Sequence, residues 1–171
     1  CDYVAFILPQ LFESDGKGSP RKRVKGLNLI HSEKIDSSFY YPGNKKVKVE
    51  CIFQIWSKND KNEKYNILKY NEDFIKIYSL SDGGTPSSTR NKNMLYDCDI
   101  YLPSTCFGEK NMKYYTCFDN LPGKKGYGIV FKKNKQAGLI KFKEQCWNKF
   151  AFLSTNSAYN IRKSQIYNVM N

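Results

Sequence analysis

Tyr3-Val-Ala-Phe-Ile-Leu-Pro9 is an uninterrupted apolar run that ends at a proline. Runs of this length are typical of strands buried on both faces, as in a parallel sheet. Residues 27–35 and 47–56 are the next strand candidates, and the second of them alternates at its start before it becomes continuously apolar. That change favours a strand that pairs antiparallel inside a covered sheet. The stretch 1–57 therefore predicts a piece of α/β sheet.

The composition of the sequence changes after residue 57. Residues 58–64 are polar and charged, which favours a linker, and residues 81–93 predict a mobile loop, so we assign 58–95 to a linker and mobile loop. In the remainder, 96–171, short strand candidates alternate with two helix candidates. The spacing of Leu139, Phe142 and Cys146 indicates one helix, and the other closes the chain at 160–170. We expect 96–171 to be a mixed α+β region.

Composition excludes several classes of protein. Of 171 residues, 40% are apolar and 15% aromatic, too many for a disordered tail, and no apolar run approaches the roughly 20 residues that span a bilayer. The six cysteines contain no C-x-x-C pair and His31 is the only histidine, so we expect no metal site. The first residues lack the pattern of a signal peptide, and these thiols suit a reducing compartment. We predict a cytoplasmic protein.

The charge of the chain predicts a polyanionic partner. Lys and Arg number 28 against 16 Asp and Glu, which gives a net charge of +12. Two basic clusters contain no acid: Lys17, Arg21, Lys22, Arg23 and Lys25, and then Lys124, Lys125, Lys132, Lys133 and Lys135. The second is interleaved with Gly126, Tyr127, Gly128 and Phe131, a mixture that suits phosphate contact and base stacking. Because 24 of the 28 basic residues are Lys, a solvated lysine-rich surface stays an alternative, as does an anionic membrane.

The sequence offers little for hydrolytic catalysis. His31 lies inside a strand candidate and is expected to be structural, and the acidic residues form no paired-carboxylate pattern. The glycine pairs Gly16/Gly18 and Gly126/Gly128 lack the third glycine and the helix of a phosphate-binding loop, so we interpret them as loop flexibility.

Several ordered segments resemble one known family. They are the run Tyr3 to Pro9, the basic loop after it, Leu27-Asn-Leu-Ile-His31, Ser38-Phe39 and Val49-Glu-Cys-Ile-Phe-Gln-Ile-Trp56. Together they resemble S-adenosylmethionine-dependent methyltransferases related to the adenine-N6 DNA methyltransferases, with Glu50 where that family has a proline. The resemblance is weaker through 127–130 and 152–162. It implies C-terminal strands of a Rossmann-like methyltransferase sheet, followed by a mixed α+β target-recognition region.

The resemblance also implies that a large part of the enzyme is elsewhere. The chain has no Pro-Pro, and thus no [DNS]-P-P-[FY] catalytic loop, and it has no room before Tyr3 for the cofactor-binding strands. S-adenosylmethionine would be bound mainly by a missing N-terminal half or by a catalytic partner chain. We expect no catalytic and no cofactor-binding residue in this chain, which alone should not transfer a methyl group.

The resemblance implies a role in substrate binding, as in a restriction-modification system. Arg21, Lys22, Arg23 and Lys25 would hold backbone phosphates beside an extruded base. Sequence reading would fall to 96–171, with Tyr127, Asn156 and Arg162 as base contacts and Lys124, Lys125 and Lys163 as further nucleic-acid contacts. The expected partner is DNA, with RNA left open, rather than a membrane. The alternative is a non-catalytic nucleic-acid-binding subunit or a degenerate methyltransferase.

Overall fold

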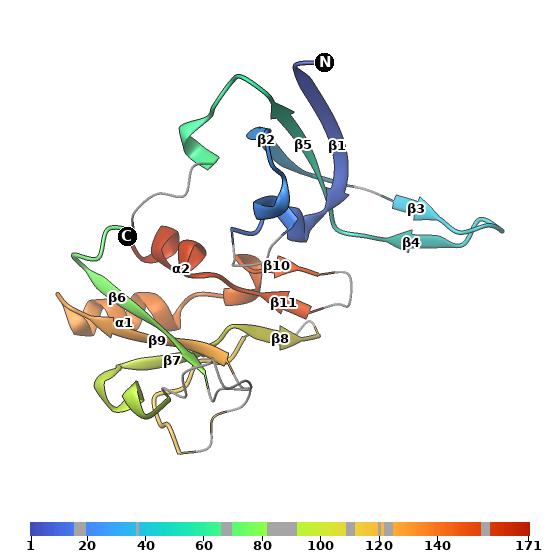
Figure 1. The fold of residues 1–171 in the computed structure, drawn as a ribbon. Coiled ribbons are helices and arrows are strands. Elements are labelled where there is room, and N and C mark those ends of the chain that lie inside the picture. Colours follow the sequence, from blue (N-terminus) through green and yellow to red (C-terminus); the bar gives the residue numbers. More distant parts are fainter. Residues whose placement is uncertain are drawn as a thin grey trace. The chain divides into compact units, whose positions relative to one another are not determined.

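The structure is a computed structural model that describes residues 1–15, 20–36, 38–65, 70–81, 92–108, 112–119, 121, 125–154 and 158–171. The chain divides into two compact units, Cys1–Lys69 with Phe152–Ser157 and Tyr70–Ala151 with Ala158–Asn171, and we describe each by itself (Figure 1). Some sequence predictions fall outside the described residues: those on Gly16, Lys17, Gly18, Lys124, Asn156 and most of the loop at 81–93.

The first unit contains a three-stranded sheet in the order β1 (Tyr3–Pro9), β5 (Cys51–Ser57), β2 (Asn28–Ile35). The central strand β5 pairs antiparallel with both neighbours. The antiparallel pairing predicted for residues 47–56 is therefore confirmed for 51–56, but the single long strand is wrong, because Lys46–Lys48 forms a separate short strand. Because both outer strands oppose β5, β1 and β2 run in the same direction, and Pro9 and Ile35 both pair with Cys51, so the two strands end in the same row.

The predicted fold class is wrong. The described strands pair antiparallel, and the described part of the chain is mostly antiparallel β with two short α-helices, not a parallel Rossmann-like α/β sheet. Neighbouring parallel strands need a crossover connection, usually an α-helix. In the first unit, the described part of the connection from β1 to β2 contains instead the 3₁₀ turns η1 (Gln10–Glu13) and η2 (Pro20–Arg23), β2 is connected to β5 by a hairpin, and the 3₁₀ turn η3 (Glu63–Tyr65) follows β5.

The strand β1 is exposed, although its sequence predicts burial on both faces. It lies at the edge of the sheet, where Tyr3 is 57% and Ile7 61% exposed. In the central strand, by contrast, Ile52 and Gln54 are fully buried. An apolar run records that a strand can be buried, but its place in the sheet decides whether it is.

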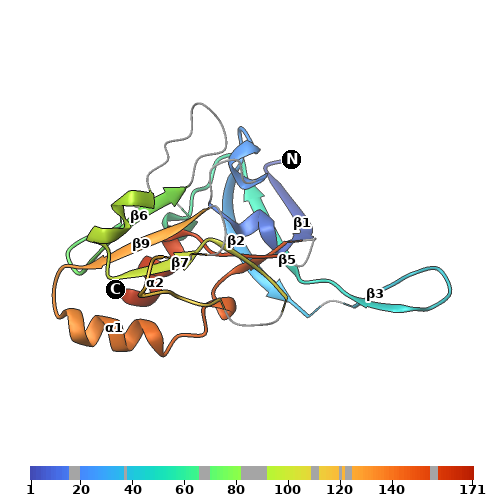
Figure 2. The ribbon, with the colours of Figure 1, turned by 90° about the horizontal axis from the view of Figure 1, so that it is seen from below.

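The remaining strands of the first unit are short. A hairpin of β3 (Ser38–Tyr40) and β4 (Lys46–Lys48) follows β2 and leads into β5, and it projects away from the sheet in both views (Figures 1 and 2). Its turn contains two residues of left-handed backbone, Gly43 (φ 91°) and Asn44 (φ 61°). The strand β10 (Phe152–Leu153) lies against η1, where the Leu153 N–H donates to Gln10 Oε1 at 3.0 Å.

The second unit is built around a sheet in the order β6 (Ile75–Ser81), β9 (Lys125–Phe131), β7 (Ile100–Pro103). Two α-helices belong to it, α1 (Lys135–Lys143) and α2 (Lys163–Met170), so the predicted closing helix is confirmed. The other elements are η4 (Lys92–Asp97), η5 (Trp147–Lys149), and the antiparallel pair β8 (Thr105–Phe107) and β11 (Ala158–Asn160). The strand β6 agrees with the loose alternation of residues 74–80, which indicates a strand, although these residues lie in the stretch that we assigned to a linker and mobile loop.

Alternation along the strands gives this sheet two covered faces. Ile77, Ile100 and Ile129 belong to the core cluster that contains Phe142 of α1 and Ile166 of α2. Residues of the opposite parity, including Leu80 of β6 and Tyr101 of β7, form a second cluster with Leu95 of η4. A sheet covered on both faces is the stable centre of this unit.

Candidate nucleic-acid interface

Three of the predicted phosphate contacts in the first unit are exposed. Lys22 and Arg23 belong to η2, and Lys25 follows before Gly26 (φ 76°) turns the chain toward β2. No ion pair of these three side chains is present among the described residues. They form a short basic segment, Lys22–Lys25, that can reach the phosphates of a nucleic acid.

Arg21 lies in the same sequence cluster but has an internal role. Its guanidinium donates to the backbone carbonyl of Glu13 at 3.4 Å and to that of Tyr65, and it lies 5.7 Å from the centre of the Tyr65 ring. Burial lowers the pKa of Arg21, while the carboxylates of Asp15 and Glu13 act in the opposite direction. Arg21 therefore holds the basic segment against the unit, and both of its terminal nitrogens donate to backbone carbonyls within that unit.

A chain of hydrogen bonds fixes the turns beneath the basic segment. The Trp56 indole donates to Gln54 Oε1 at 3.2 Å, Gln54 Nε2 donates to Ser32 Oγ at 3.2 Å, and Ser32 Oγ donates to Glu13 Oε1 at 3.1 Å. The Ser32 N–H also donates to the Tyr65 hydroxyl at 2.9 Å. Gln54 is fully buried, so its polar groups need these partners. The network ties η1 and η3 to the sheet and so positions η2.

Tyr127 does not present a face for stacking. Its ring is 8% exposed in the core of the second unit, and its hydroxyl donates to the Ile161 carbonyl at 3.3 Å. The glycines on either side have a packing role: a Cβ on Gly126 would lie 2.4 Å from the Tyr101 ring, and one on Gly128 would lie 2.5 Å from Cys98 Sγ. Our interpretation of this glycine pair as loop flexibility is wrong, because both glycines lie in the central strand β9.

The second basic cluster of the sequence is divided in space. Lys125 begins β9, whereas Lys132 and Lys133 follow its end, so about 20 Å of strand separate them at 3.3 Å per residue. Lys135 Nζ lies 2.5 Å from Asp99 Oδ1, which neutralises part of its charge. These lysines are exposed, but they do not form a single patch.

Arg162 and Lys163 lie at the start of α2. The Arg162 N–H donates to Gln165 Oε1 at 2.7 Å. Lys163 Nζ donates to the Ile77 carbonyl at 2.6 Å, and burial lowers the pKa of Lys163, with Glu72 acting in the opposite direction. The Lys163 ammonium is thus engaged within the unit, as Arg21 is in the first.

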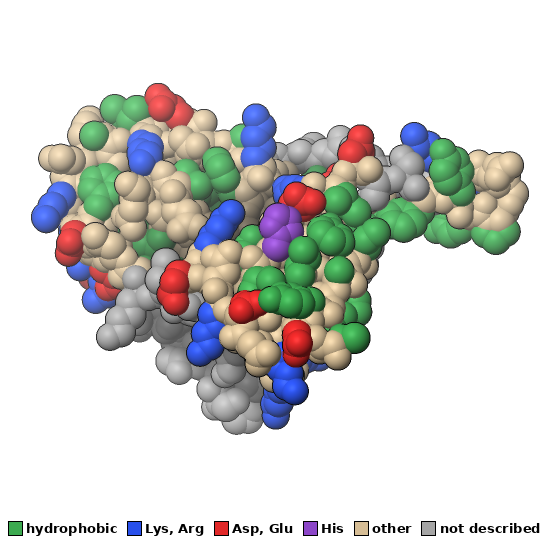
Figure 3. Space-filling view, turned by 90° about the horizontal axis from the view of Figure 1, so that it is seen from above, with side chains coloured by type: hydrophobic (Ala, Val, Ile, Leu, Met, Phe, Trp, Pro, Cys, Tyr) green, Lys and Arg blue, Asp and Glu red, His purple; other side chains and the backbone are tan. Residues whose placement is uncertain are grey.

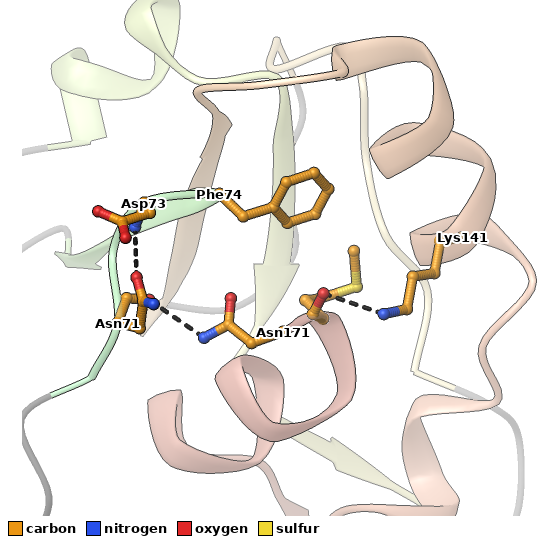
Figure 4. A pocket seen from close by; sticks show the side chains of 6 residues that line it. Asn71, Asp73, Phe74, Lys141 and Asn171 are labelled. Carbon is orange, nitrogen blue, oxygen red and sulfur yellow. Dashed lines mark hydrogen bonds between the residues drawn. The ribbon is translucent and has the colours of Figure 1, made fainter.

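Among the described residues no group of three His, Cys, Asp or Glu side chains could hold a metal ion. His31 Nε2 lies 3.4 Å from Glu33 Oε2 at the surface. A hollow of about 340 Å³ in the second unit is lined by Asn71, Asp73, Phe74, Lys141, Met170 and Asn171 (Figure 4). Its polar groups are used to hold the end of α2, since Lys141 donates to the Met170 carbonyl at 2.9 Å and Asn171 donates to the Asn71 carbonyl at 3.1 Å.

Sequence reasoning missed one exposed group of residues. Phe39, Tyr40 and Tyr41 are 43%, 63% and 60% exposed on the β3–β4 hairpin, beside the exposed Lys45 and Lys46. From the sequence, residues 36–43 are expected to form a turn-rich connection, and no binding role was assigned to them. Three successive aromatics close to a lysine pair were the available signal.

Comparisons with known proteins give no match. No protein family, no curated protein and no solved structure matches this chain. In the part of the chain that the structure describes, no helix is long and apolar enough to cross a membrane.

Proposed function

We propose that this chain is the substrate-binding half of an S-adenosylmethionine-dependent DNA adenine-N6 methyltransferase, which binds DNA phosphates and presents a target base. The observation that carries the proposal is the basic segment Lys22–Lys25, with two exposed cations on an anchored 3₁₀ turn and a third, Lys25, just after it. This segment lies on the connection between β1 and β2, and its last residue, Lys25, comes three residues before β2 begins at Asn28. Fixed cations at such a position suit contacts to a phosphate backbone.

The described residues do not fit S-adenosylmethionine itself. Two described strands lead into α-helices, β9 through Lys132-Lys133-Asn134 and β11 through Ile161-Arg162, and neither connection contains a glycine. A nucleoside cofactor at a strand-to-helix turn needs glycine there, so that the backbone can approach it closely. The proposal therefore assigns the cofactor and the catalytic loop to another polypeptide segment. The exposed apolar side chains of β1, Tyr3 and Ile7, support a partner at that edge of the sheet.

The DNA-binding part of the proposal is tested by titrating a labelled mixed-sequence duplex between 50 and 200 mM salt, a range over which phosphate contacts are strongly weakened. Substituting Lys22, Arg23 and Lys25 with Ala is expected to reduce the slope of log affinity against log salt by about 0.9 per lost contact, or about 2.7 in all. Lys58→Ala/Lys61→Ala/Lys143→Ala removes three exposed charges elsewhere and should keep the larger slope. Equal slopes for the two triple variants would overturn the role of the basic segment.

The methyltransferase part is tested on the coding frame immediately upstream of Cys1. A glycine-rich turn and an N-P-P-[FY] loop in frame, with transfer of a labelled methyl group to adenine by the extended protein, would support it. An unrelated upstream sequence combined with intact duplex binding would favour the non-catalytic nucleic-acid-binding subunit. Tighter binding of an RNA duplex of the same sequence would replace DNA by RNA as the substrate.

A further inference from the structure

The β3–β4 hairpin exposes aromatic side chains that nothing in its own unit covers. Tyr40 is 63% and Tyr41 60% exposed, and Phe39 is 43% exposed. No hydrogen bond or ring contact to the Tyr40 or Tyr41 ring is found among the described residues. Figure 3 shows hydrophobic side chains gathered along the projecting arm that this hairpin forms. Contiguous exposed aromatics are uncommon on a monomer and are typical of a surface that meets a partner.

The hairpin fixes the backbone that carries these rings. Its ladder pairs Phe39 with Val47 and Tyr40 with Lys46. The turn is closed by two backbone hydrogen bonds, Tyr41 N–H to the Lys45 carbonyl at 2.9 Å and Asn44 N–H to the Tyr41 carbonyl at 3.1 Å. A ligand therefore meets a backbone that is already ordered, which reduces the entropy lost on binding.

The charged side chains of the hairpin sequence are all basic. Between Asp36 and Glu50 the chain contains Lys45, Lys46 and Lys48 and no acidic residue. Lys45 and Lys46 are exposed, and Lys46 lies directly across the ladder from Tyr40. The Tyr40 and Lys46 side chains therefore lie on the same face of the hairpin. Lysine is depleted in the buried centre of protein interfaces, so this pattern favours a polyanion over an apolar protein partner.

We propose that the β3–β4 hairpin binds unpaired nucleotides, with Tyr40 and Tyr41 as stacking surfaces for bases and with Lys45 and Lys46 as phosphate contacts. Exposed aromatics combined with flanking cations are the recurring means of binding single strands without sequence preference. The inference rests on the proposed function, because it names the form of nucleic acid that the first unit takes. The hairpin and the basic segment both belong to the first unit: the hairpin follows the end of β2 at Ile35, and the basic segment precedes its start at Asn28.

The test compares a fluorescent single-stranded oligonucleotide with the duplex of the same sequence. Tyr40→Ala/Tyr41→Ala is expected to weaken single-strand binding at least about tenfold, since each stacked base contributes substantially, and to change duplex binding less than threefold. Lys45→Ala/Lys46→Ala should reduce the salt slope for the single strand by about 1.4, at about 0.7 per contact. Tyr96→Ala, which removes a ring that is 82% exposed in the second unit, is the aromatic control and should bind as the wild type does. Lys58→Ala/Lys61→Ala is the control for charge.

Results other than these would overturn either the binding role of the hairpin or the proposed role of the basic segment. Unchanged single-strand affinity of Tyr40→Ala/Tyr41→Ala, or an equal loss with Tyr96→Ala, would overturn the inference while leaving duplex binding by the basic segment intact. Hairpin-dependent single-strand binding together with duplex binding insensitive to Lys22, Arg23 and Lys25 would support the inference and overturn the proposed role of that segment. If the tyrosines control binding to phosphatidylserine vesicles and not to oligonucleotides, the hairpin is a membrane surface and the inference is wrong.

Discussion

Replacing Gly126 with Ala tests whether the glycines of β9 serve packing or ligand binding. A Cβ at this position would lie 2.4 Å from Tyr101 Cζ, 2.4 Å from its hydroxyl oxygen and 2.6 Å from Cε2. Tyr101 is fully buried between β9 and the segment that contains Tyr115, so its ring has little room to move. The strand or the ring must therefore shift when the methyl group is added.

The expected cost follows from two opposing effects. Overpacking a well-packed core costs about 1–3 kcal/mol, and three contacts on a buried ring belong near the upper end of that range. Replacing Gly by Ala in a strand recovers about 0.5–1 kcal/mol of backbone entropy. The net destabilisation is then about 2 kcal/mol, which lowers the melting temperature of a chain of this size by about 4–8 °C.

The assay is thermal and urea unfolding followed by circular dichroism, with duplex affinity measured at a temperature where the variant stays folded. Gly128→Ala is the matched comparison: its new Cβ meets Cys98 Sγ at 2.5 Å and Leu80 Cδ1 at 2.7 Å, both ends of side chains that can turn away. We expect a smaller loss there, partly restored by Cys98→Ala. If Gly126→Ala is as stable as the wild type but binds the duplex more weakly, the packing argument is refuted and the glycines act at a ligand.

Three further outcomes follow from buried polar groups. Arg21→Ala should lower the free energy of unfolding by about 1–3 kcal/mol in urea titrations, because two backbone carbonyls lose a charged donor. The same variant should leave the salt slope of DNA binding unchanged. A reduced slope would mean that Arg21 belongs to the interface after all. Burial and the hydrogen bond to Glu72 raise the pKa of Tyr167 to about 12 from the ordinary 10.0. The contribution of this shift to the free energy of unfolding, up to about 3 kcal/mol, is therefore present below pH 10 and is lost as pH rises toward 12. Urea midpoints measured across that range should show this loss in the wild type and not in Tyr167→Phe. Burial raises the pKa of the Cys98 thiol to about 11, so Cys98 should react far more slowly with a thiol reagent at pH 8 than the exposed Cys117, and comparable rates would contradict its burial.

The direction of the strands was predictable only in part. Residues 47–56 were expected to pair antiparallel, as β5 does over Cys51–Ser57, whereas the parallel sheet expected from the run Tyr3 to Pro9 is wrong. The same kind of reasoning failed for β1, since Tyr3 and Ile7 look suited to a buried strand although they lie at an edge. Position within a sheet depends on which strands are present beside it, and no local periodicity records that.

The candidate site was predictable as a charge but not as a set of side chains. Arg21 and Lys22 are neighbours in one basic run, yet one is directed at the Tyr65 and Glu13 carbonyls and the other is exposed. Lys163 is likewise engaged by the Ile77 carbonyl, a contact between residues far apart in the sequence. Composition reveals how many cations a chain has, whereas tertiary contacts decide which of them remain available.

The difference between available and engaged cations separates two contributions to binding, long-range attraction and short-range contact, which the net charge alone does not distinguish. Residues 96–171 contain 12 basic and 5 acidic residues, but Lys125 and Lys132 lie at opposite ends of β9 and cannot contact the same phosphates of a nucleic acid. Scattered charge of this kind acts at long range and raises the rate of association, while short-range contacts control dissociation.

Lys132→Ala/Lys133→Ala should therefore slow association with a duplex, measured by stopped-flow fluorescence. The dissociation rate should stay within about twofold, as expected for charges outside the contact surface. Lys22→Ala/Arg23→Ala removes the same charge from the first unit and should speed dissociation. Faster dissociation of the Lys132/Lys133 variant would move the contact surface into the second unit, against the argument made from Arg21, Tyr127 and Lys163.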